Sequence, residues 1–170
     1  DIVDYFNRQY VGENAVVIIA GNTKDGSALK KAEKYFSPLR HGKSYEKVKV
    51  VEMQRGPAAL FKTKQTDQTH ICLGARGFNT FDPKKYISQL IATVLGGGMS
   101  SRMFISVRER KGLVYYISTV SDSDTDTGSV FTRAGIDNTK VEKAVRTIVL
   151  EYKKMKRQKV SDTELKKAKN

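Results

Sequence analysis

The sequence contains a single cysteine and two histidines, which limits the chemistry that the chain can carry by itself. Because Cys72 has no second cysteine to pair with, an internal disulfide is excluded. Its neighbours Ile71 and Leu73 favour a buried cysteine in a strand over a reactive thiol. Neither His41 nor His70 has a glutamate or a second histidine at ligand spacing, so we expect no metal site within the chain.

Long apolar runs are also missing. No stretch approaches the ~20 apolar residues of a membrane-spanning helix. The start, DIVDYFNRQY, has an acidic, aromatic and helical pattern that differs from a signal peptide. We therefore expect a soluble chain without a membrane partner, for which a cytoplasmic location is a guess. The end, ELKKAKN, stops inside a charged helical pattern without a cap, so we interpret the chain as a fragment excised from a longer protein.

Positive charge, by contrast, is abundant. The chain has 31 lysines and arginines against 18 acidic residues, a net charge of +13, which attracts nucleic acid, anionic membranes or acidic peptides. The lysines are dispersed along the chain, which favours solvated helix faces over a nucleic-acid groove. No aromatic motif of an RNA-binding module is present. A basic nucleic-acid module is therefore the least favoured interpretation, and it predicts binding that weakens steeply with salt.

The length of 170 residues and the content of 39% hydrophobic and 29% charged residues are typical of one globular domain with a real core. In the first half, the run NAVVIIAG is continuous and β-branched, which predicts a strand buried on both faces. The predicted elements there are a helix over residues 1–10, this strand from Asn14 to Gly21, a helix from Asp25 to Phe36 that Pro38 ends, and a hairpin of Ala58 to Lys64 with Thr69 to Arg76.

The second half alternates helices and strands. Asp82 and Pro83 predict the start of a helix that buries Tyr86, Leu90, Ile91 and Val94. After a central helix, we expect an antiparallel pair, Leu113 to Val120 with Ser129 to Gly135, a helix from Asp137 or Asn138 to Gln158 whose packed sides carry Val141, Ala144, Val145, Ile148, Leu150 and Tyr152, and a last helix with a capping box of Ser161 and Glu164. The fold class is α+β, a layered α/β domain with a mixed, largely antiparallel sheet packed against helices.

The central stretch from Leu95 to Tyr116, LGGGMSSRMFISVRERKGLVYY, combines a flexible loop, a helix and a strand. Ser100 and Ser101 are candidate N-caps. In the helix, Met103, Phe104, Val107 and Ile105 can face a core, whereas the charged residues Arg102, Arg108, Glu109 and Arg110 cannot.

Arg108 and Tyr115 are the candidate functional pair. The seven-residue spacing, RERKGLVY, allows both side chains to point to one mouth. A guanidinium and a phenol hydroxyl are donors that can stabilise a developing oxyanion. The alternative is that Arg108 pairs with a surface carboxylate and Tyr115 packs under the sheet. Tyr116 should face the opposite side of the strand from Tyr115, which makes it an internal control.

Two other motifs give weaker indications of function. A nucleotide-binding P-loop is not indicated by the loop of Gly96, Gly97, Gly98, Met99 and Ser100, because it lacks the Gly-Lys-Ser/Thr ending. The alternative to a functional loop is a structural one, a tight turn that ends the preceding helix. The acidic turn with Asp122, Asp124 and Asp126 lacks the glycine and glutamate of a calcium loop, so we interpret it as a solvated hairpin tip.

The pattern LGGGMSSRxFxxVRExxGLxY resembles the second-subdomain signature of the M16 (insulinase/pitrilysin-like) zinc metallopeptidases. The similarity continues through NAVVIIAGN, EKYF, QTHICLGARG, DTGSVFTRAGID and VSDTELKKAKN, and so covers nearly the whole chain. It departs from an active member in one respect, since the inverted zinc motif His-x-x-Glu-His does not occur.

The resemblance implies a non-zinc, C-terminal "inactive" domain over residues 1–170, with the M16/LuxS-like metallohydrolase fold. In relatives, an arginine and a tyrosine at the positions of Arg108 and Tyr115 hold the substrate carbonyl, and the glycine loop is a mobile lip of the peptide chamber. Zinc would belong to the parent protein or to a partner half. The implied partners are a zinc-bearing M16 half, a peptide substrate and a dimer of clamshell halves.

The parent protein is then expected to be a zinc metalloendopeptidase that hydrolyses peptides in a closed chamber, whereas this chain alone should be inactive. The alternative is a catalytically silent scaffold or partner subunit of the same family. The presence of both Arg108 and Tyr115 argues against that alternative.

Overall fold

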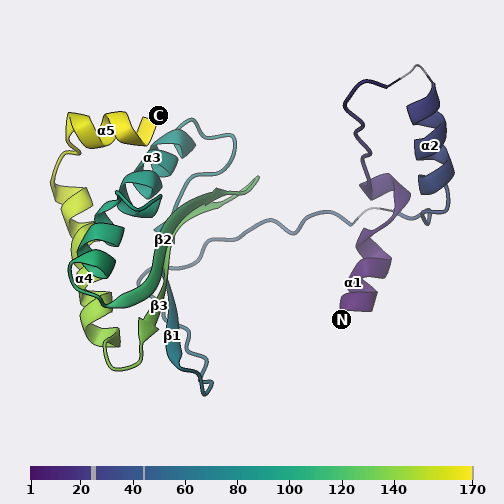
Figure 1. Cartoon of the computed structure of the whole chain (residues 1–170). Helices are drawn as coiled ribbons and strands as arrows, with labels where there is room; N and C mark the ends of the chain where they lie inside the picture. The colour runs from purple at the N-terminus through teal and green to yellow at the C-terminus, as the bar shows by residue number, and fades with distance from the viewer. Residues whose placement is uncertain (24–25, 44, 170) are drawn as a thin grey trace. The chain divides into compact units, whose positions relative to one another are not determined.

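The computed structural model describes residues 1–23, 26–43 and 45–169, and its internal contacts divide the chain into two compact units, Asp1–Lys49 and Val50–Asn170. No helix in the described ranges is long and apolar enough to cross a membrane. The elements are α1 (Ile2–Gln9), the 3₁₀ turn η1 (Gly12–Asn14), α2 (Ser27–Phe36), β1 (Gln68–Arg76), α3 (Lys85–Gly96), η2 (Phe104–Glu109), β2 (Val114–Ser123), β3 (Gly128–Asp137), α4 (Val141–Arg157) and α5 (Asp162–Lys169) (Figure 1).

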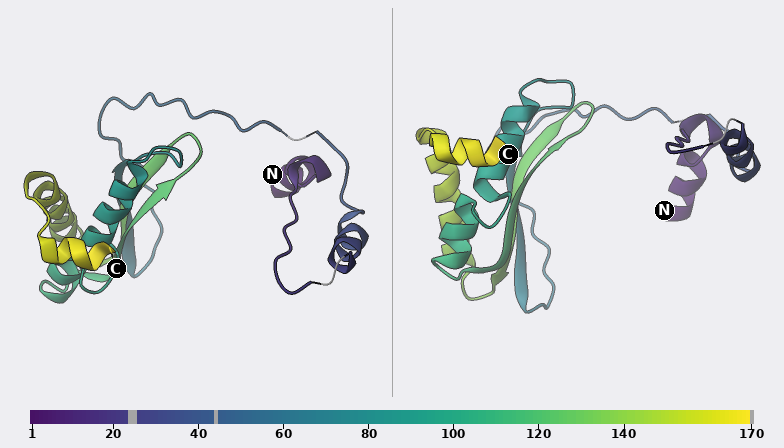
Figure 2. Two further views of the ribbon diagram at one scale, coloured as in Figure 1. Left: turned by 90° about the horizontal axis from the view of Figure 1, so that it is seen from above. Right: turned by 45° about the horizontal axis from the view of Figure 1, so that its top comes forward.

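The second unit is built on a three-stranded sheet in the order β1-β3-β2. Both pairings are antiparallel, so the predicted pair of strands is confirmed and the sheet is antiparallel throughout. Helices α3 and α4 lie on one face of this sheet, and α5 crosses the end of α3 (Figures 1 and 2). The α+β fold class is therefore confirmed.

The core lies between the sheet and these helices. Of the predicted inward residues of the central helix, Met103 and Val107 are confirmed as fully buried, whereas Phe104 and Ile105 are only partly buried. Met103 and Val107 pack with Leu95, Leu113, Val114, Ile117, Ala134, Ile136, Ala144 and Ile148. Within this apolar layer the Thr132 hydroxyl lies 2.8 Å from both the Thr119 and the Tyr152 hydroxyls, so these buried polar groups satisfy one another.

The caps predicted at Asp82 and at Asp137 or Asn138 are wrong, because α3 begins at Lys85 and α4 at Val141, each without a side-chain cap bond. Asp82 Oδ1 accepts the Lys84 N–H at 2.8 Å in the turn that precedes α3. Two buried faces are also rotated from the predicted ones. In α3, Tyr86 is 61% exposed, and the buried face comprises Ser88, Ala92, Val94, Leu95 and Gly96. In α4, Leu150 is half exposed and its neighbour Glu151 is buried, because Ala144, Ile148 and Glu151 share one helix face.

Serine caps were predicted at the starts of two helices, and only the cap of α5 at Ser161 is confirmed. The Glu164 N–H bonds the Ser161 hydroxyl at 3.3 Å, and the Ser161 N–H bonds Glu164 Oε2 at 3.2 Å, which is a complete capping box. The caps predicted at Ser100 and Ser101 are wrong. No side-chain cap bond precedes the central helix, and the Ser101 hydroxyl is buried without a partner among the described residues.

The predicted hairpin that includes β1 and the predicted burial of Cys72 are also wrong. Residues 58–64 form no strand, and Leu60 is 98% exposed, so the predicted hairpin does not exist. Residues 68–76 form β1 as predicted, but the partner of β1 is β3. Cys72 lies on the face of β1 turned away from the helices and is exposed, because within the second unit the helices cover only the other face.

In the first unit, the helices are present but the predicted burial is not. Residues 14–21 are in no strand, and Val16 and Ile18 are 86% and 84% exposed. In α2, Leu29 and Phe36 are 64% and 50% exposed, and the predicted first residue, Asp25, lies outside the described residues. The physical reason is common to all: the described part of this unit contains no sheet against which these side chains could pack.

Candidate functional site

Arg108 lies on an irregular turn of the central helix. Over η2 the backbone is π-helical, with Arg110 N–H bonded to the Ile105 carbonyl at 2.9 Å. Such wide turns often occur at functional sites because they displace side chains from the regular helix face. Arg108 is exposed, and its guanidinium carbon lies 4.9 Å from the centre of the Phe104 ring. No ion pair joins Arg108 to a carboxylate of the described residues, so the pairing considered as an alternative is not observed.

Tyr115 lies on a second irregularity, at the start of β2. Val114 pairs with Ile136 and Tyr116 pairs with Gly135, so Tyr115 is the extra residue of a β-bulge. A bulge re-aims side chains and is common next to functional sites. The Tyr115 ring is 54% exposed and does not pack under the sheet, so both candidate residues are accessible to solvent.

Tyr116, the expected control, has a different environment. Its hydroxyl lies 3.0 Å from Nδ1 of His70, across Gly135 on the intervening strand. A Cβ added to Gly135 would lie 2.8 Å from Cδ1 of the Tyr116 ring, so the glycine makes room for this crossing. In a regular strand, side chains alternate between the two faces, which would place Tyr115 and Tyr116 on opposite faces. The bulge interrupts this alternation, and Tyr116 is 42% exposed, much as Tyr115 is.

The glycine loop divides into a packed part and an open part. Gly96 is the last residue of α3 and is buried, and a Cβ there would lie 2.5 Å from the backbone nitrogen of Thr119 on β2. Gly98 has no neighbour within 4 Å of such a Cβ, and Met99 is 77% exposed. Gly96 is therefore required for close helix–sheet packing, whereas the residues from Gly98 to Ser100 lie open at the surface.

A partly buried ion pair near this loop was not predicted from the sequence. Arg102, expected to face solvent, forms two bonds to Glu164, at 2.7 Å from Nε to Oε1 and 2.8 Å from the terminal nitrogen to Oε2. These bonds, together with the Ser161 N–H, lower the pKa of Glu164 to about 2, and they raise the pKa of Arg102. The pair joins the start of the central helix to α5. No local signal marks it, because its members are far apart in the chain.

The family model described as "Peptidase M16 inactive domain" matches residues 1–170. The chain belongs to the M16 peptidase family. A zinc protease of Bacillus subtilis, YmxG, described as uncharacterized, is 32% identical over 169 residues, which are 97% of this chain and 40% of that protein. The M16 chain described here thus spans less than half the length of this curated relative.

Solved structures agree on the fold. An M16 inactive domain from Pseudomonas fluorescens has a TM-score of 0.73 at 22% identity, over 94% of this chain and 39% of that one. A protease from Helicobacter pylori has a TM-score of 0.72 at 19% identity, over 98% of this chain and 42% of that one. At these identities the likeness establishes the M16 fold and leaves activity open.

The M16 relative from Bacillus subtilis is named a zinc protease, and a zinc site in this chain would need a group of His, Cys, Asp or Glu donors. No group of three or more His, Cys, Asp or Glu residues in the described ranges could hold a metal ion. His70 is bonded to Tyr116, and His41 belongs to the other unit. This donor set does not fit zinc, and no chemical step of this chain is derived through a metal.

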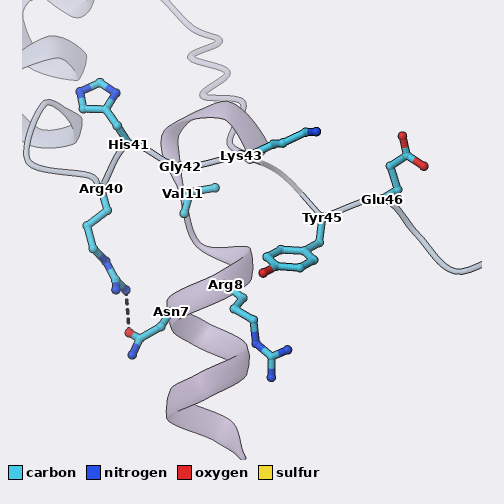
Figure 3. Close-up of a pocket in the computed structure, with 9 residues that line it drawn as sticks. All are labelled: Asn7, Arg8, Val11, Arg40, His41, Gly42, Lys43, Tyr45 and Glu46. Carbon is cyan, nitrogen blue, oxygen red and sulfur yellow. Dashed lines mark hydrogen bonds between the residues drawn. The ribbon is translucent and has the colours of Figure 1, made fainter.

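His41 borders a basic pocket of the first unit, which Figure 3 shows with nine lining residues. The pocket has a volume of about 620 Å³. Its cations are largely engaged: Arg40 bonds the Asn7 amide oxygen at 2.8 Å, and Arg8 pairs with Asp4. The His41 ring points away from Asn7 and Arg8, so the pocket brings no ligand set together (Figure 3).

Proposed function

We propose that this chain is the substrate-holding, non-zinc domain of an M16-type zinc metallopeptidase, and that residues 1–170 act as one C-terminal-type domain of it. The zinc and the glutamate that activates water belong to another half, in the same polypeptide or in a second subunit. A peptide enclosed between the two halves is the substrate, and the assembled particle is a dimer of such clamshell halves.

The role of Arg108 and Tyr115 in this proposal is to donate hydrogen bonds to the scissile carbonyl. Preorganised donors are most effective where negative charge develops, at the oxygen of the tetrahedral intermediate. The observation that supports this role is that both residues lie on backbone irregularities, a π-turn and a β-bulge, and that both side chains are exposed. Their sequence neighbours Val107 and Val114 are buried in the core.

The second candidate function is a catalytically silent scaffold or partner subunit. Fold and family membership are common to both candidates, so only the chemistry of the exposed pair separates them. A scaffold has no need for an exposed guanidinium at Arg108 or an exposed phenol at Tyr115, and a substitution of either residue would leave assembly and the activity of the partner unchanged.

The test is Arg108→Ala in the assembled protein, with Arg110→Ala as the matched control on the same exposed segment. Removing one oxyanion donor lowers kcat by about 10²–10³-fold in characterised hydrolases, and we expect a loss of that order with an unchanged melting temperature. Arg110→Ala should change kcat less than about threefold. If Arg108→Ala leaves kcat intact, the scaffold function is correct.

A second consequence concerns the isolated chain. Because its described residues hold no group suited to a metal, we expect no zinc-dependent hydrolysis of unfolded peptides by the purified 170-residue chain, with or without added zinc. Activity that a chelator abolishes in this preparation would overturn the assignment to the non-zinc half.

A further inference from the structure

The guanidinium of Arg108 is placed by an aromatic ring. Its central carbon lies 4.9 Å from the centre of the Phe104 ring, four residues earlier in the same π-helical segment, Phe104–Glu109. A cation over the face of an aromatic ring is attracted by the negative charge of that face. No oxygen of the described residues accepts a hydrogen bond from the Arg108 side chain. The ring is therefore what orients this cation within the described part of the chain.

The Phe104 ring stands on a fixed part of the backbone. Its neighbour Met103 and, three residues further on, Val107 are fully buried in the core. Phe104 itself is partly buried, whereas Arg108 is exposed. A phenylalanine side chain has far fewer rotamers than an arginine side chain. The ring can therefore restrict the guanidinium, and the guanidinium contributes little to placing the ring.

Other arginines of the second unit are oriented at the expense of their donors. Arg102 gives two N–H groups to Glu164, and Arg146 gives two to Glu142. An arginine held in this way has its charge compensated and fewer donors left for a ligand. Attraction to the Phe104 ring uses no acceptor oxygen. It suits an arginine that must present its N–H donors to an oxyanion that exists only briefly.

We propose that Phe104 is a positioning residue for Arg108, and that its ring holds the guanidinium in the orientation that meets the scissile carbonyl. This inference rests on the proposed function for the identity of the ligand. In this role the ring acts only through the arginine and touches no reacting atom. By restricting the rotamers of Arg108 before the substrate arrives, it reduces the conformational entropy that is lost when the oxyanion is bound.

Phe104→Leu in the assembled protein tests this role, because leucine fills the inner part of the site but has no ring face. We expect kcat to fall about five- to thirtyfold, which corresponds to a cation–π pair partly shielded from water, with KM changed less than about twofold. Phe104→Tyr keeps the ring face and should stay within about twofold of the unchanged protein. In an Arg108→Ala background, Phe104→Leu should lower kcat no further, because the group that it positions is absent. Losses that multiply independently would overturn the proposal.

The matched control is Phe131→Leu, which removes the ring from a second pair, that of Phe131 with Arg133 at 4.6 Å. On β3 this ring lies four residues from Gly135, the position that pairs with Tyr116, so kcat should change less than about twofold. An equal loss in the control would mean that the effect is not specific to the ring beside Arg108, and would overturn the positioning role.

Fluorinated phenylalanine at position 104 separates the charge of the ring face from packing. It keeps the shape of the ring and withdraws negative charge from its face. We expect kcat to decrease with each fluorine that is added, and the melting temperature to stay unchanged. A loss in Phe104→Leu that fluorination does not reproduce would mean that Phe104 only packs, which overturns the proposal.

A readout without peptidase activity separates this inference from the proposed function. In nuclear magnetic resonance spectra of the 170-residue chain, the ring should displace the Nε–H signal of Arg108 upfield relative to that of the exposed Arg110. The displacement should persist in Phe104→Tyr and disappear in Phe104→Leu. Coincident signals in the unchanged chain would overturn the inference, whatever Arg108→Ala does to kcat.

The kinetic outcomes assign each failure to one proposal. A displaced signal together with an unchanged kcat in Arg108→Ala overturns the proposed function, although the contact with the ring stands. A large loss in Arg108→Ala together with an unchanged kcat in Phe104→Leu overturns the positioning role alone.

Discussion

Arg102 and Glu164 connect the start of the central helix to α5 through an ion pair with two hydrogen bonds. The Arg102 side chain is only 17% exposed and that of Glu164 is 36% exposed. Glu164 also closes the capping box with Ser161, so a single carboxylate serves both the helix end and the tertiary contact. Disruption of the pair should therefore free α5 before the rest of the unit unfolds.

This pair predicts an acid-labile contribution to stability. The pKa of Glu164 falls from its ordinary value of 4.5 to about 2 in the folded chain, chiefly through the bonds from Arg102. A lowered folded pKa means that the contribution is complete above about pH 4.5 and is lost as the pH falls toward 2. Glu164→Gln should cost about 1 kcal/mol at pH 7 after allowance for solvent screening, and should flatten the stability profile between pH 4.5 and 2 in urea titrations.

The matched control is Glu142→Gln, which breaks an ion pair with Arg146 along one helix. Both side chains of that pair are more than three-quarters exposed, so the change should cost less than about 0.5 kcal/mol. If the two variants have the same free energy of unfolding at pH 7, the Arg102–Glu164 contact does not hold α5 in solution.

The glycine run predicts a sharp difference between neighbouring substitutions. Gly96→Ala would place a methyl group 2.5 Å from the Thr119 backbone nitrogen, which cannot move without distorting β2, so we expect a loss of about 1–3 kcal/mol. Gly98→Ala meets nothing within 4 Å and should change stability by less than about 0.5 kcal/mol. Chemical denaturation of both variants measures the difference. Equal stability would mean that α3 does not pack closely on β2.

Some signals within one turn or one helix were predictable from the sequence, although the caps at Ser100 and Ser101 were not. The capping box at Ser161 and the inward positions of Met103 and Val107 depend on spacings of three or four residues. The failures at residues 14–21 and 58–64 have a single cause. A sequence pattern reports that a segment could be a strand, but a strand exists only with partners, and no partner for either segment is among the described residues.

The candidate site was predictable only in part. The exposure of Arg108 and Tyr115 agrees with the expectation of two accessible donors. The π-turn and the bulge that present them were not predictable, because an unpaired extra residue depends on the register with β3 and has no local sequence signal. The same dependence on register explains why Tyr116 contacts His70, which is distant in the chain.

Tyr115 and Tyr116 provide the most stringent test of the proposed donors, because two adjacent tyrosines lose the same atom in the change to phenylalanine. Tyr115→Phe removes a hydroxyl that is proposed to bond the oxyanion, so kcat of the assembled protein should fall by about 10–10²-fold with KM less affected. Tyr116→Phe removes a hydroxyl that is bonded to His70, so it should cost up to about 1 kcal/mol of stability and leave kcat within about twofold. Steady-state kinetics with one peptide substrate and urea unfolding of both variants measure the two effects. If Tyr116→Phe lowers kcat and Tyr115→Phe leaves it unchanged, the donor to the oxyanion is Tyr116 on the open face of the sheet and not Tyr115 at the bulge.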